Sequence, residues 1–442
     1  MKRRAFLKSS IAGLVLAQGA ARAQIESAND RIVVAVVGIR DRGMDLAEEL
    51  ARQPNVELRY LADVDTRLFQ ERVARIESIT GKAPQCVQDF RKTLDDPEID
   101  AIATATPDHW HALITLWACQ AGKDVYVEKP TSHSVWESRK MVEAARKYKR
   151  VVQVGTQNRS ADYIYKALDY IQSGGLGDIH FVRVMNSKMR EDIGRPADSA
   201  VPAGVDYDLW LGPAPERPFN ENRFHYNWHW FWDYGGGDVV NDGVHQIDLA
   251  RWMTGQRLPK AVSSAGGMFY FDDARETPDT QTITWEFEKL TIVLEQTLWT
   301  PYMKKIPFEL RDQDRLPNWP FAATRVELCG TKNFMYLSRM GGGWQVYDAE
   351  GQSIAIQHGR FSPANTAHIV NFLDCIRTRE TPRADIEEGH YSTLLAHYGN
   401  IAYRVGRRLH IDPVTEGFLH DDEANTLVKR TYRAPYIVPD QV

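Results

Sequence analysis

Short apolar runs alternate with segments of helical spacing along the first third of the chain. Residues 31–37 read Arg-Ile-Val-Val-Ala-Val-Val, which predicts a strand buried on both faces. Apolar residues then recur three or four positions apart from Met44 to Ala51, which predicts a helix. The alternation continues with strands expected at 56–62, 101–104, 124–127 and 151–155, and helices at 67–79, 109–121 and 134–148. This pattern predicts a doubly wound parallel sheet over residues 30–156.

The pattern changes after Gly155. One helix is expected at 160–173, and two more at 366–377 and 390–408. Alternating apolar and polar residues predict strands at 179–188, 261–271, 280–287 and 291–299. Such alternation is typical of an antiparallel sheet with one covered face. We therefore expect residues 157–442 to form a second α/β domain with a large, mostly antiparallel open sheet.

Residues 1–23 have the features of a signal peptide. A basic start is followed by an apolar run at 11–20 and by Ala21-Arg22-Ala23, a small-x-small cleavage site. The run Arg3-Arg4-Ala5-Phe6-Leu7-Lys8 resembles the twin-arginine export signal. The apolar run is too short for a stable membrane span, so we expect a periplasmic protein that is exported folded and keeps no span after cleavage. An ordinary basic signal region, or an uncleaved surface anchor, is the alternative.

Composition narrows the class of partner. The 442 residues carry a net charge of −5, although the first 23 are basic and contain no acid, so the rest is more acidic still. An acidic body without a basic stripe excludes nucleic acid as a partner. The four cysteines lie far apart without zinc-ligand spacing, and we expect no metal site. The 12 tryptophans fit either a carbohydrate site or ordinary core packing.

The turn after the first strand has the position of a dinucleotide-binding turn. It reads Gly38-Ile39-Arg40-Asp41-Arg42-Gly43, so Arg40 replaces the middle glycine of G-x-G-x-x-G. Asp63 ends the second strand, where a carboxylate binds the ribose hydroxyls of NAD and repels a 2′-phosphate. Arg40 is placed to lie along the pyrophosphate. The nearby Arg67 keeps NADP as the alternative cofactor. The predicted cofactor-binding residues here are Gly38, Ile39, Arg40, Gly43 and Asp63.

Four separated motifs then occur in one order: residues 105–111 (ATPDHWH), Glu128-Lys129-Pro130, residues 155–157 (GTQ) and residues 235–248 (GGGDVVNDGVHQID). Together they resemble the Gfo/Idh/MocA oxidoreductase family over nearly the whole chain after residue 23. The resemblance implies a Rossmann domain and an α/β domain whose open sheet often mediates oligomers. A homo-oligomer, dimer or tetramer, is therefore expected. It also implies NAD(P)-dependent chemistry on sugars, inositols and polyols.

The resemblance also implies roles for single residues. Lys129 matches the catalytic lysine that contacts the reacting oxygen, and His245 matches the catalytic histidine. Further positions match residues that line the cofactor, namely Thr106, Pro107, His109, Glu128, Lys129 and Gln157.

The sequence departs from the family at the partner of the histidine. Many members carry an aspartate four residues before it, where this chain has Asn241. An amide cannot stabilise an imidazolium by charge. Asp242, three residues before His245, or Asp248 would have to replace that carboxylate. We therefore group Asn241 and Asp242 with Lys129 and His245 as candidate catalytic residues, and Asp242 and His245 also as substrate contacts.

Residues 224–234 form the densest aromatic stretch of the chain. Helical packing would space aromatic residues by three or four, whereas these are nearly consecutive, so some must face a cavity or a partner. We expect Trp228 or Trp230 to stack on a sugar, with Tyr226 and His229 as polar contacts. A subunit interface is the alternative.

The resemblance, together with the export signal, leaves three functions open. The first is an NAD(P)-dependent oxidoreductase that transfers a hydride between a tightly bound nicotinamide and a hydroxyl carbon of a sugar, glycoside or polyol. The second is an NAD-dependent enzyme that cleaves glycosides through transient oxidation and elimination. The third is a non-catalytic periplasmic binding protein.

Overall fold

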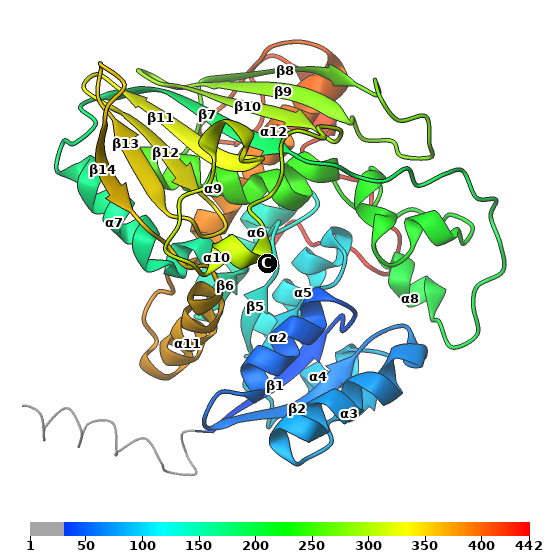
Figure 1. The fold of residues 1–442 in the computed structure, drawn as a ribbon. Coiled ribbons are helices and arrows are strands. Elements are labelled where there is room, and N and C mark those ends of the chain that lie inside the picture. The colour runs from blue at the N-terminus through cyan, green and yellow to red at the C-terminus, as the bar shows by residue number, and fades with distance from the viewer. Residues whose placement is uncertain (1–30) are drawn as a thin grey trace, which may run out of the picture.

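The computed structural model describes residues 31–442 and contains two sheets (Figure 1). The first has six strands in the order β3-β2-β1-β4-β5-β6, and all its pairs are parallel. Its strands are β1 (Ile32–Val37), β2 (Val56–Ala62), β3 (Gln85–Val87), β4 (Ala101–Thr104), β5 (Asp124–Val127) and β6 (Val152–Val154). The helices between them are α2 (Arg42–Ala51), α3 (Phe69–Thr80), α4 (Arg91–Asp95), α5 (Asp108–Gln120) and α6 (Val135–Lys147). The predicted doubly wound sheet is confirmed.

The strand order of this sheet reverses direction at β1. The chain passes from β1 outward to β2 and β3, and then returns to β4 on the other side of β1. Ligands of open parallel sheets bind outside the carboxyl ends of the strands at such a switch point. All six residues of β1 are buried, because helices cover both faces of the sheet.

The second sheet has nine strands in the order β14-β13-β12-β11-β7-β10-β9-β8-β15. Its pairs are antiparallel except for β7 with β10, so the predicted mostly antiparallel sheet is confirmed. The strands are β7 (Ile179–Ser187), β8 (Ala261–Gly267), β9 (Thr280–Glu286), β10 (Thr291–Thr297), β11 (Thr324–Gly330), β12 (Phe334–Ser338), β13 (Trp344–Tyr347), β14 (Ser353–Gln357) and β15 (Leu409–His410). Strands β11–β14 were not predicted, although β11 alternates polar and apolar residues.

The remaining elements follow β6 in the chain, except for η2, which lies between β2 and α3. The helices are α7 (Asp162–Gln172), α8 (Tyr207–Leu211), α9 (Val244–Thr254), α10 (Phe308–Arg311), α11 (Ser362–Thr378), α12 (Ile386–Val405) and α13 (Asp422–Thr426). Short 3₁₀ turns are η2 (Thr66–Leu68), η3 (Gln157–Ser160), η4 (Glu221–Arg223), η5 (Asn227–Trp230) and η7 (Trp319–Phe321), and η6 (Val239–Gly243) is a π-helical turn.

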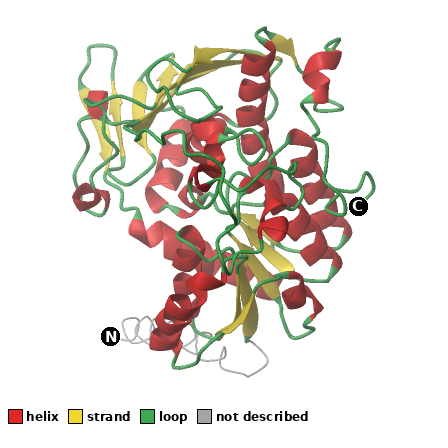
Figure 2. Ribbon diagram, turned by 90° about the vertical axis from the view of Figure 1, so that its right-hand side faces the viewer, coloured by secondary structure: helices red, strands yellow, loops and turns green. Residues whose placement is uncertain are grey.

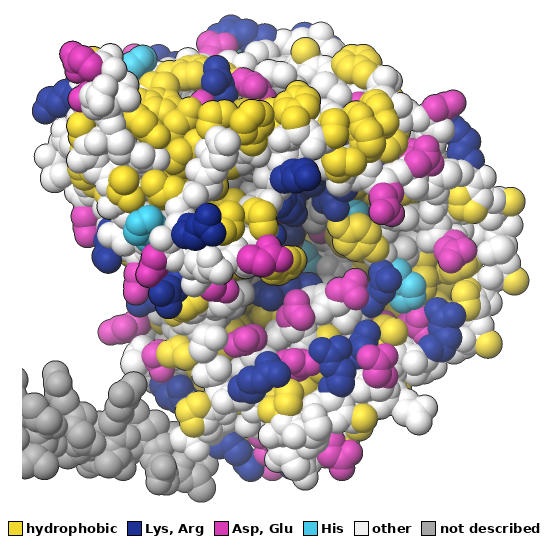
Figure 3. Space-filling view, in the orientation of Figure 1, with side chains coloured by type: hydrophobic (Ala, Val, Ile, Leu, Met, Phe, Trp, Pro, Cys, Tyr) yellow, Lys and Arg dark blue, Asp and Glu magenta, His cyan; other side chains and the backbone are white. Residues whose placement is uncertain are grey.

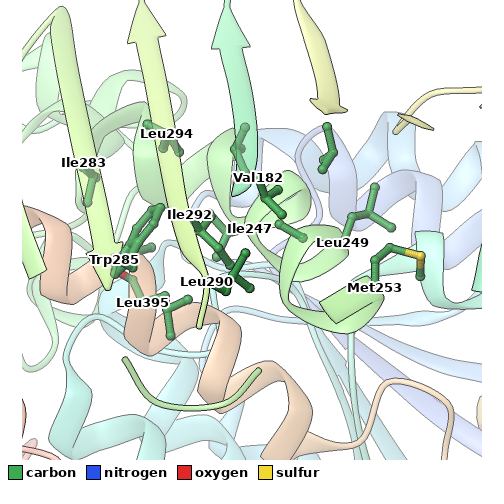
Figure 4. Packing of buried hydrophobic residues seen from close by; sticks show 14 of the residues in the cluster. Val182, Ile247, Leu249, Met253, Ile283, Trp285, Leu290, Ile292, Leu294 and Leu395 are labelled. Atoms are coloured by element: carbon green, nitrogen blue, oxygen red, sulfur yellow. The ribbon is translucent and has the colours of Figure 1, made fainter. Parts of the chain in front are cut away.

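The largest core lies between the inner face of the nine-stranded sheet and helices α9 and α12. Strand residues such as Ile283, Ile292 and Leu294 meet Ile247 of α9 and Leu395 of α12 there (Figure 4). Figure 2 shows the two sheets at opposite ends of the molecule, with helices packed between them. This core fixes α9, which carries part of the candidate site, against the sheet.

Helix α11 returns from the C-terminal half of the chain to the Rossmann sheet. Phe372 packs edge-on against Tyr126 of β5 at a centroid distance of 5.8 Å. Gln153 of β6 donates to the carbonyl of His368 at 2.8 Å. The C-terminal segment also reaches this domain, where Tyr436 packs on Trp110 of α5. Segments that follow residue 156 in the sequence therefore also pack on the Rossmann domain.

Other expectations concern the surface and the ends of the chain. The predicted signal peptide at 1–23 lies outside the described residues. From residue 31 onward, no helix is both long and apolar enough to cross a bilayer. The four cysteines, all within the described part, are free thiols.

Candidate active site

A cavity of about 490 Å³ lies at the carboxyl ends of the Rossmann strands, between the two domains. Figure 3 shows the surface hollowed at this place. One end of the cavity, here called the cofactor end, is lined by Gly38, Arg40 and Asp63. The other end, called the catalytic end, is lined by Lys129, Asn241, His245 and Arg339. The cavity is thus lined by three kinds of element: the ends of the parallel strands, the π-helical turn η6 and the end of β12 in the second sheet.

The turn between β1 and α2 has no room for side chains at its two glycines. Gly38 has a φ of +78°, and a Cβ on it would lie 2.9 Å from the amide nitrogen of Thr106. A Cβ on Gly43 would lie 1.6 Å from the carbonyl oxygen of Gly38. Only Gly38 lines the cavity, so Gly43 acts by closing the turn. The Ile39 side chain is fully buried in the core, which corrects its predicted place beside the cofactor.

Asp63 lies at the end of β2 and faces the cofactor end. Its carboxylate accepts from the N–H groups of Ile39 and Asp65, each at 2.9 Å. Burial raises the pKa of Asp63 to about 6, although those two hydrogen bonds act against the rise. Arg67 is occupied elsewhere, because its guanidinium pairs with Asp65 at 2.6 Å.

These features fit NAD. Gly38 and Gly43 let this turn pack closely against the loop after β4 and against itself. The turn leads into the N-terminus of α2, where the helix dipole favours an anion such as a pyrophosphate. The Asp63 carboxylate is placed to accept hydrogen bonds from ribose hydroxyls, and Arg67, being paired with Asp65, is not positioned as a 2′-phosphate ligand. Arg40, which replaces the usual glycine, lines the same end and adds a positive charge.

Lys129 follows β5 at the catalytic end. Its Nζ donates to the backbone oxygen of Asn241 at 2.7 Å and to the Oδ1 of Asn241 at 3.4 Å. Burial lowers the pKa of Lys129, while the negative charges of Glu128 and Asp242 oppose this shift. A lowered pKa increases the fraction of neutral amine, which is the form that takes a proton from a hydroxyl group.

Glu128 is held behind Lys129 by a buried network. Arg42 of α2 donates to the Glu128 carboxylate at 2.7 Å, and Gln157 donates to it at 3.3 Å. A Cβ on Gly155 would lie 2.7 Å from that carboxylate, so glycine is required there. Burial alone would raise the pKa of Glu128, but Arg42 and Lys129 bring it below its usual value. Arg42 was missed in the sequence, because its partner lies 86 positions away.

His245 lies in the first turn of α9 and lines the cavity. Its Nδ1 is buried without a hydrogen-bond partner among the described residues. Burial and the positive charges of Arg339 and Lys129 hold the pKa of His245 well below its usual value, so the imidazole is neutral at pH 7. Asn241 lies in the π-helical turn η6 just before it, and π-helical turns are frequent at functional sites. Asn241 accepts from Lys129, and its side-chain amide donates to Asp238 at 3.4 Å.

Asp242 does not replace the missing dyad carboxylate. Its side chain forms ion pairs with Lys188 and Arg339, and with Lys305 at 2.7 Å. It does not line the cavity and makes no hydrogen bond with His245 in the described part of the chain. The predicted role of Asp242 as a substrate contact is corrected for the same reason. Asp248 pairs instead with Arg159 at 2.8 Å.

The loop after β4 contributes different residues from those expected. Thr106 and Pro107 line the cavity, as expected from the motif. His109 is fully buried behind the cavity wall, and its Nε2 lies 2.8 Å from the Trp210 carbonyl, which corrects its predicted cofactor contact. His111 lines the cavity, with its two ring nitrogens 2.7 Å from the Pro130 oxygen and 2.9 Å from the Thr106 oxygen. Residues two positions apart point to different sides of a helix, so His109 of α5 points into the core and His111 points toward the cavity.

The aromatic stretch divides between cavity and core. Tyr226 and Trp228 line the cavity. Trp230 is only 2% exposed, and the guanidinium groups of Arg190 and Arg275 lie 5.5 and 5.0 Å from its ring. His229 is also buried. The predicted sugar contacts of Trp230 and His229 are therefore corrected, because the 3₁₀ turn η5 directs these two side chains into the protein.

Arg339 was not predicted as a site residue. It follows β12, one of the strands that the sequence analysis missed, and it lines the cavity near Lys129 and His245. The sequence signal that could have identified Arg339 is its position directly after the apolar segment that forms β12.

Comparisons with known proteins agree with this geometry. A family model described as "Oxidoreductase family, NAD-binding Rossmann fold" matches residues 11–156. A second, described as "Oxidoreductase family, C-terminal alpha/beta domain", matches residues 192–272 and 347–438. Both family models describe domains of the Gfo/Idh/MocA oxidoreductases.

Two curated relatives act on inositols according to their names. The chain is 23% identical to the scyllo-inositol 2-dehydrogenase (NAD(+)) of Bacillus subtilis, over 67% of this chain and 72% of the relative. It is 31% identical to the inositol 2-dehydrogenase of Rubrobacter xylanophilus, over 52% of this chain and 54% of the relative. Over three other curated relatives, the chain spans only 64%, 36% and 45% of the relative's length.

The fold is also that of a solved sugar dehydrogenase. Levoglucosan dehydrogenase in complex with NADH superposes with a TM-score of 0.64 at 18% identity. The match covers 87% of this chain and the whole of that chain (100%). At this identity the likeness establishes the shared architecture.

Proposed function

The chain belongs to the Gfo/Idh/MocA oxidoreductase family, and on this basis we propose that it transfers a hydride between bound NAD and a hydroxyl carbon of a sugar, glycoside or polyol. The observation that carries the proposal is the place of Lys129, whose amine lines the cavity at the end of β5 with a lowered pKa. NAD, when bound, supplies the group that accepts or returns the hydride. The sugar dehydrogenase fold and the inositol dehydrogenase relatives support the substrate class.

The chain's own residues manage the proton. A hydroxyl that loses a hydride from its carbon must also lose its O–H proton, and the neutral Lys129 amine is the group placed to accept it at Nζ. The Asn241 oxygens hold Nζ through two hydrogen bonds, which leaves a direction open toward the cavity. The neutral His245 is placed to accept a hydrogen bond from a second substrate hydroxyl or to relay the proton.

Two aromatic side chains support a ring-shaped substrate. Trp228 and Tyr226 line the cavity from the segment before the Gly235-Gly236-Gly237 turn. Indole faces pack well against the C–H faces of sugar rings, and the Tyr226 hydroxyl adds a polar group. This arrangement suits a monosaccharide or a glycoside end more than an open aliphatic alcohol.

The test begins with the cofactor. Mass spectrometry of small molecules released from the denatured protein is expected to detect NAD or NADH. Purified protein is then incubated with a panel of aldoses, glycosides and inositols, and NADH formation is followed. Release of free sugar from a glycoside without net NADH would instead identify the cleavage reaction. Failure to contain or bind NAD(H) or NADP(H) would leave only a non-catalytic binding protein.

We also propose that the protein is exported folded to the periplasm with NAD already bound. The basis is the twin-arginine pattern of residues 3–8 and the cleavage site at 21–23. Cell fractionation of the full chain and of an Arg3→Lys, Arg4→Lys variant tests this proposal. The variant should stay in the cytoplasm, and equal periplasmic amounts would contradict it.

The outer face of the nine-stranded sheet is the proposed surface for a homo-oligomer. Figure 3 shows hydrophobic side chains gathered over these strands, and Ile354 and Ile356 of β14 are about half exposed. Contiguous exposed apolar area of this kind is typical of interaction surfaces. Light scattering of the purified protein should give a dimer or tetramer, and Ile356→Glu should shift it toward the monomer.

A further inference from the structure

Four basic side chains surround two carboxylates beside the catalytic end of the cavity. Lys188 and Arg190 follow β7, Lys305 lies in the connection after β10, and Arg339 follows β12. The carboxylates, Asp238 and Asp242, come from the segment that contains the π-helical turn. The cluster therefore joins four separate segments of the second domain.

The ion pairs of this cluster leave positive charge uncompensated. Asp238 pairs with Lys188 and with Arg190, each at 2.7 Å. Asp242 pairs with Lys305 at 2.7 Å and also contacts Lys188 and Arg339. Two carboxylates thus serve four bases, and Lys129 adds a further amine nearby. Lys188 and Arg339 are buried and each is ion-paired, but the cluster as a whole holds more bases than acids, and an anionic ligand would offset that excess.

The uncompensated charge faces the cavity. Arg339 lines it directly. Lys305 is not one of the lining residues, but it pairs with the same carboxylate as Arg339, that of Asp242, and its side chain is 35% exposed. Among the described residues, every acid that lines the cavity comes from the Rossmann domain and none from the second domain. Figure 3 shows dark-blue Lys and Arg side chains inside the hollow between the domains.

We propose that the substrate is a sugar acid, whose carboxylate binds to Arg339 and Lys305 while its hydroxyl carbon faces Lys129. This inference rests on the proposed sugar oxidoreductase function and narrows its substrate class. A guanidinium and an ammonium that share a carboxylate form charge-assisted hydrogen bonds, which are stronger than the neutral bonds available to a plain sugar. The whole chain has a net charge of −5, so an excess of basic side chains is a property of this site and not of the protein in general.

The basic cluster has one competing explanation. Arg339 and Lys129 also lower the pKa of His245, so these charges would keep the imidazole neutral without touching substrate. In that case removal of a base would alter the pH profile equally for acidic and neutral sugars. Removal of a carboxylate-binding base instead raises KM for the acid alone.

The experiment compares matched pairs of sugars with the NAD-loaded protein. Glucuronate is tested against glucose, and galacturonate against galactose, with glucose 6-phosphate as a further anion. We expect kcat/KM for the uronates to exceed that for the neutral sugars at least about tenfold, through KM, and the advantage to shrink with added salt because screening weakens the contact. A preference for neutral sugars, or for the phosphate over both, overturns the sugar-acid assignment.

Variants locate the effect on the proposed residues. Lys305→Met should lower kcat/KM for uronates about tenfold, with little change for neutral sugars. Lys304→Met removes the same charge from the exposed neighbouring position and should change neither. Arg339→Gln should have the larger effect on uronate KM, and circular dichroism checks its fold. Equal effects of Lys305→Met on both sugar classes would overturn the inference. Absence of turnover with every sugar and polyol would instead contradict the proposed function itself.

Discussion

The two ends of the cavity are built in different ways. The cofactor end comes from a continuous strand-turn-helix, with Gly38 and Asp63 only 25 positions apart. The catalytic end is assembled from Lys129, Asn241, His245 and Arg339, which lie on distant segments. Local geometry determines the first end, whereas packing of the two domains determines the second.

The ends also differ in charge. At the cofactor end, Arg40 and Asp63 both line the cavity, so a base and an acid of the Rossmann domain are present together. In the basic cluster beside the catalytic end, four bases share two carboxylates. A dinucleotide brings its own negative pyrophosphate to the helix N-terminus, while the substrate must supply its charge to the basic cluster. Perturbing each end should therefore affect binding and turnover separately.

The largest separation is expected for Lys129→Met. Loss of the proton acceptor should lower kcat about 10³-fold, within the usual range for general acid–base groups. NAD affinity should stay within about threefold, because Lys129 lies at the other end of the cavity. Stopped-flow turnover and NAD titration measure the two quantities. Lys92→Met, at an exposed position, is the control, and substantial activity of Lys129→Met would show that another group takes the proton.

Gly38→Ala should affect the cofactor end most. A non-glycine residue at a φ of +78°, with its Cβ 2.9 Å from the Thr106 nitrogen, requires the turn to move. Strain of about 1–3 kcal/mol corresponds to a rise in Kd for NAD on the order of 10- to 100-fold.

Gly81→Ala is the matched control for that turn. Gly81 has a similar φ of +71°, but a Cβ there meets nothing within 4 Å. Its NAD affinity should be unchanged. Equal losses in both variants would mean that general destabilisation, and not the closed turn, explains the effect.

Acid pH should weaken NAD binding through Asp63. Its pKa of about 6 means that the carboxylate takes up a proton as pH falls through 6, and a protonated carboxyl accepts ribose hydrogen bonds less well. Because binding favours the ionised form, the Kd for NAD should rise up to about tenfold per unit below pH 6. Asp63→Asn should weaken binding at pH 7 and flatten the profile between pH 7 and 5. A flat profile for the unmodified protein would contradict this role.

The smallest change is expected from Asn241→Asp. A carboxylate beside Lys129 Nζ favours the ammonium form and should raise the pKa of the lysine by about one unit. The ascending limb of kcat/KM against pH should then move to higher pH by the same amount. Asn365→Asp places a carboxylate elsewhere on the cavity wall and should shift it less. An unshifted profile for Asn241→Asp would remove Lys129 as the titrating group.

Much of the fold was predictable because strand and helix periods are local properties. The predicted strands 101–104 and 124–127 coincide with β4 and β5. The Rossmann turn, Asp63 and Lys129 were also identified from the sequence, and the structure places all three on one cavity. Strands β11–β14 were not predicted, even though β11 alternates polar and apolar residues, and Arg339, which follows β12, was therefore not predicted either.

The sequence by itself thus determined the alternation of strands and helices in the first domain, its parallel sheet and the glycine turn after β1, because each depends mainly on residues close together in the chain. Only the tertiary structure decided which side chains meet. Arg339 contacts Asp242 across 97 positions, and Arg42 contacts Glu128 across 86. It also decided that His111 and not His109 lines the cavity, and that Trp228 and not Trp230 does so. The direction of a side chain depends on the turn that carries it and on the residues that pack behind it. The spacing of residues in the sequence predicts neither.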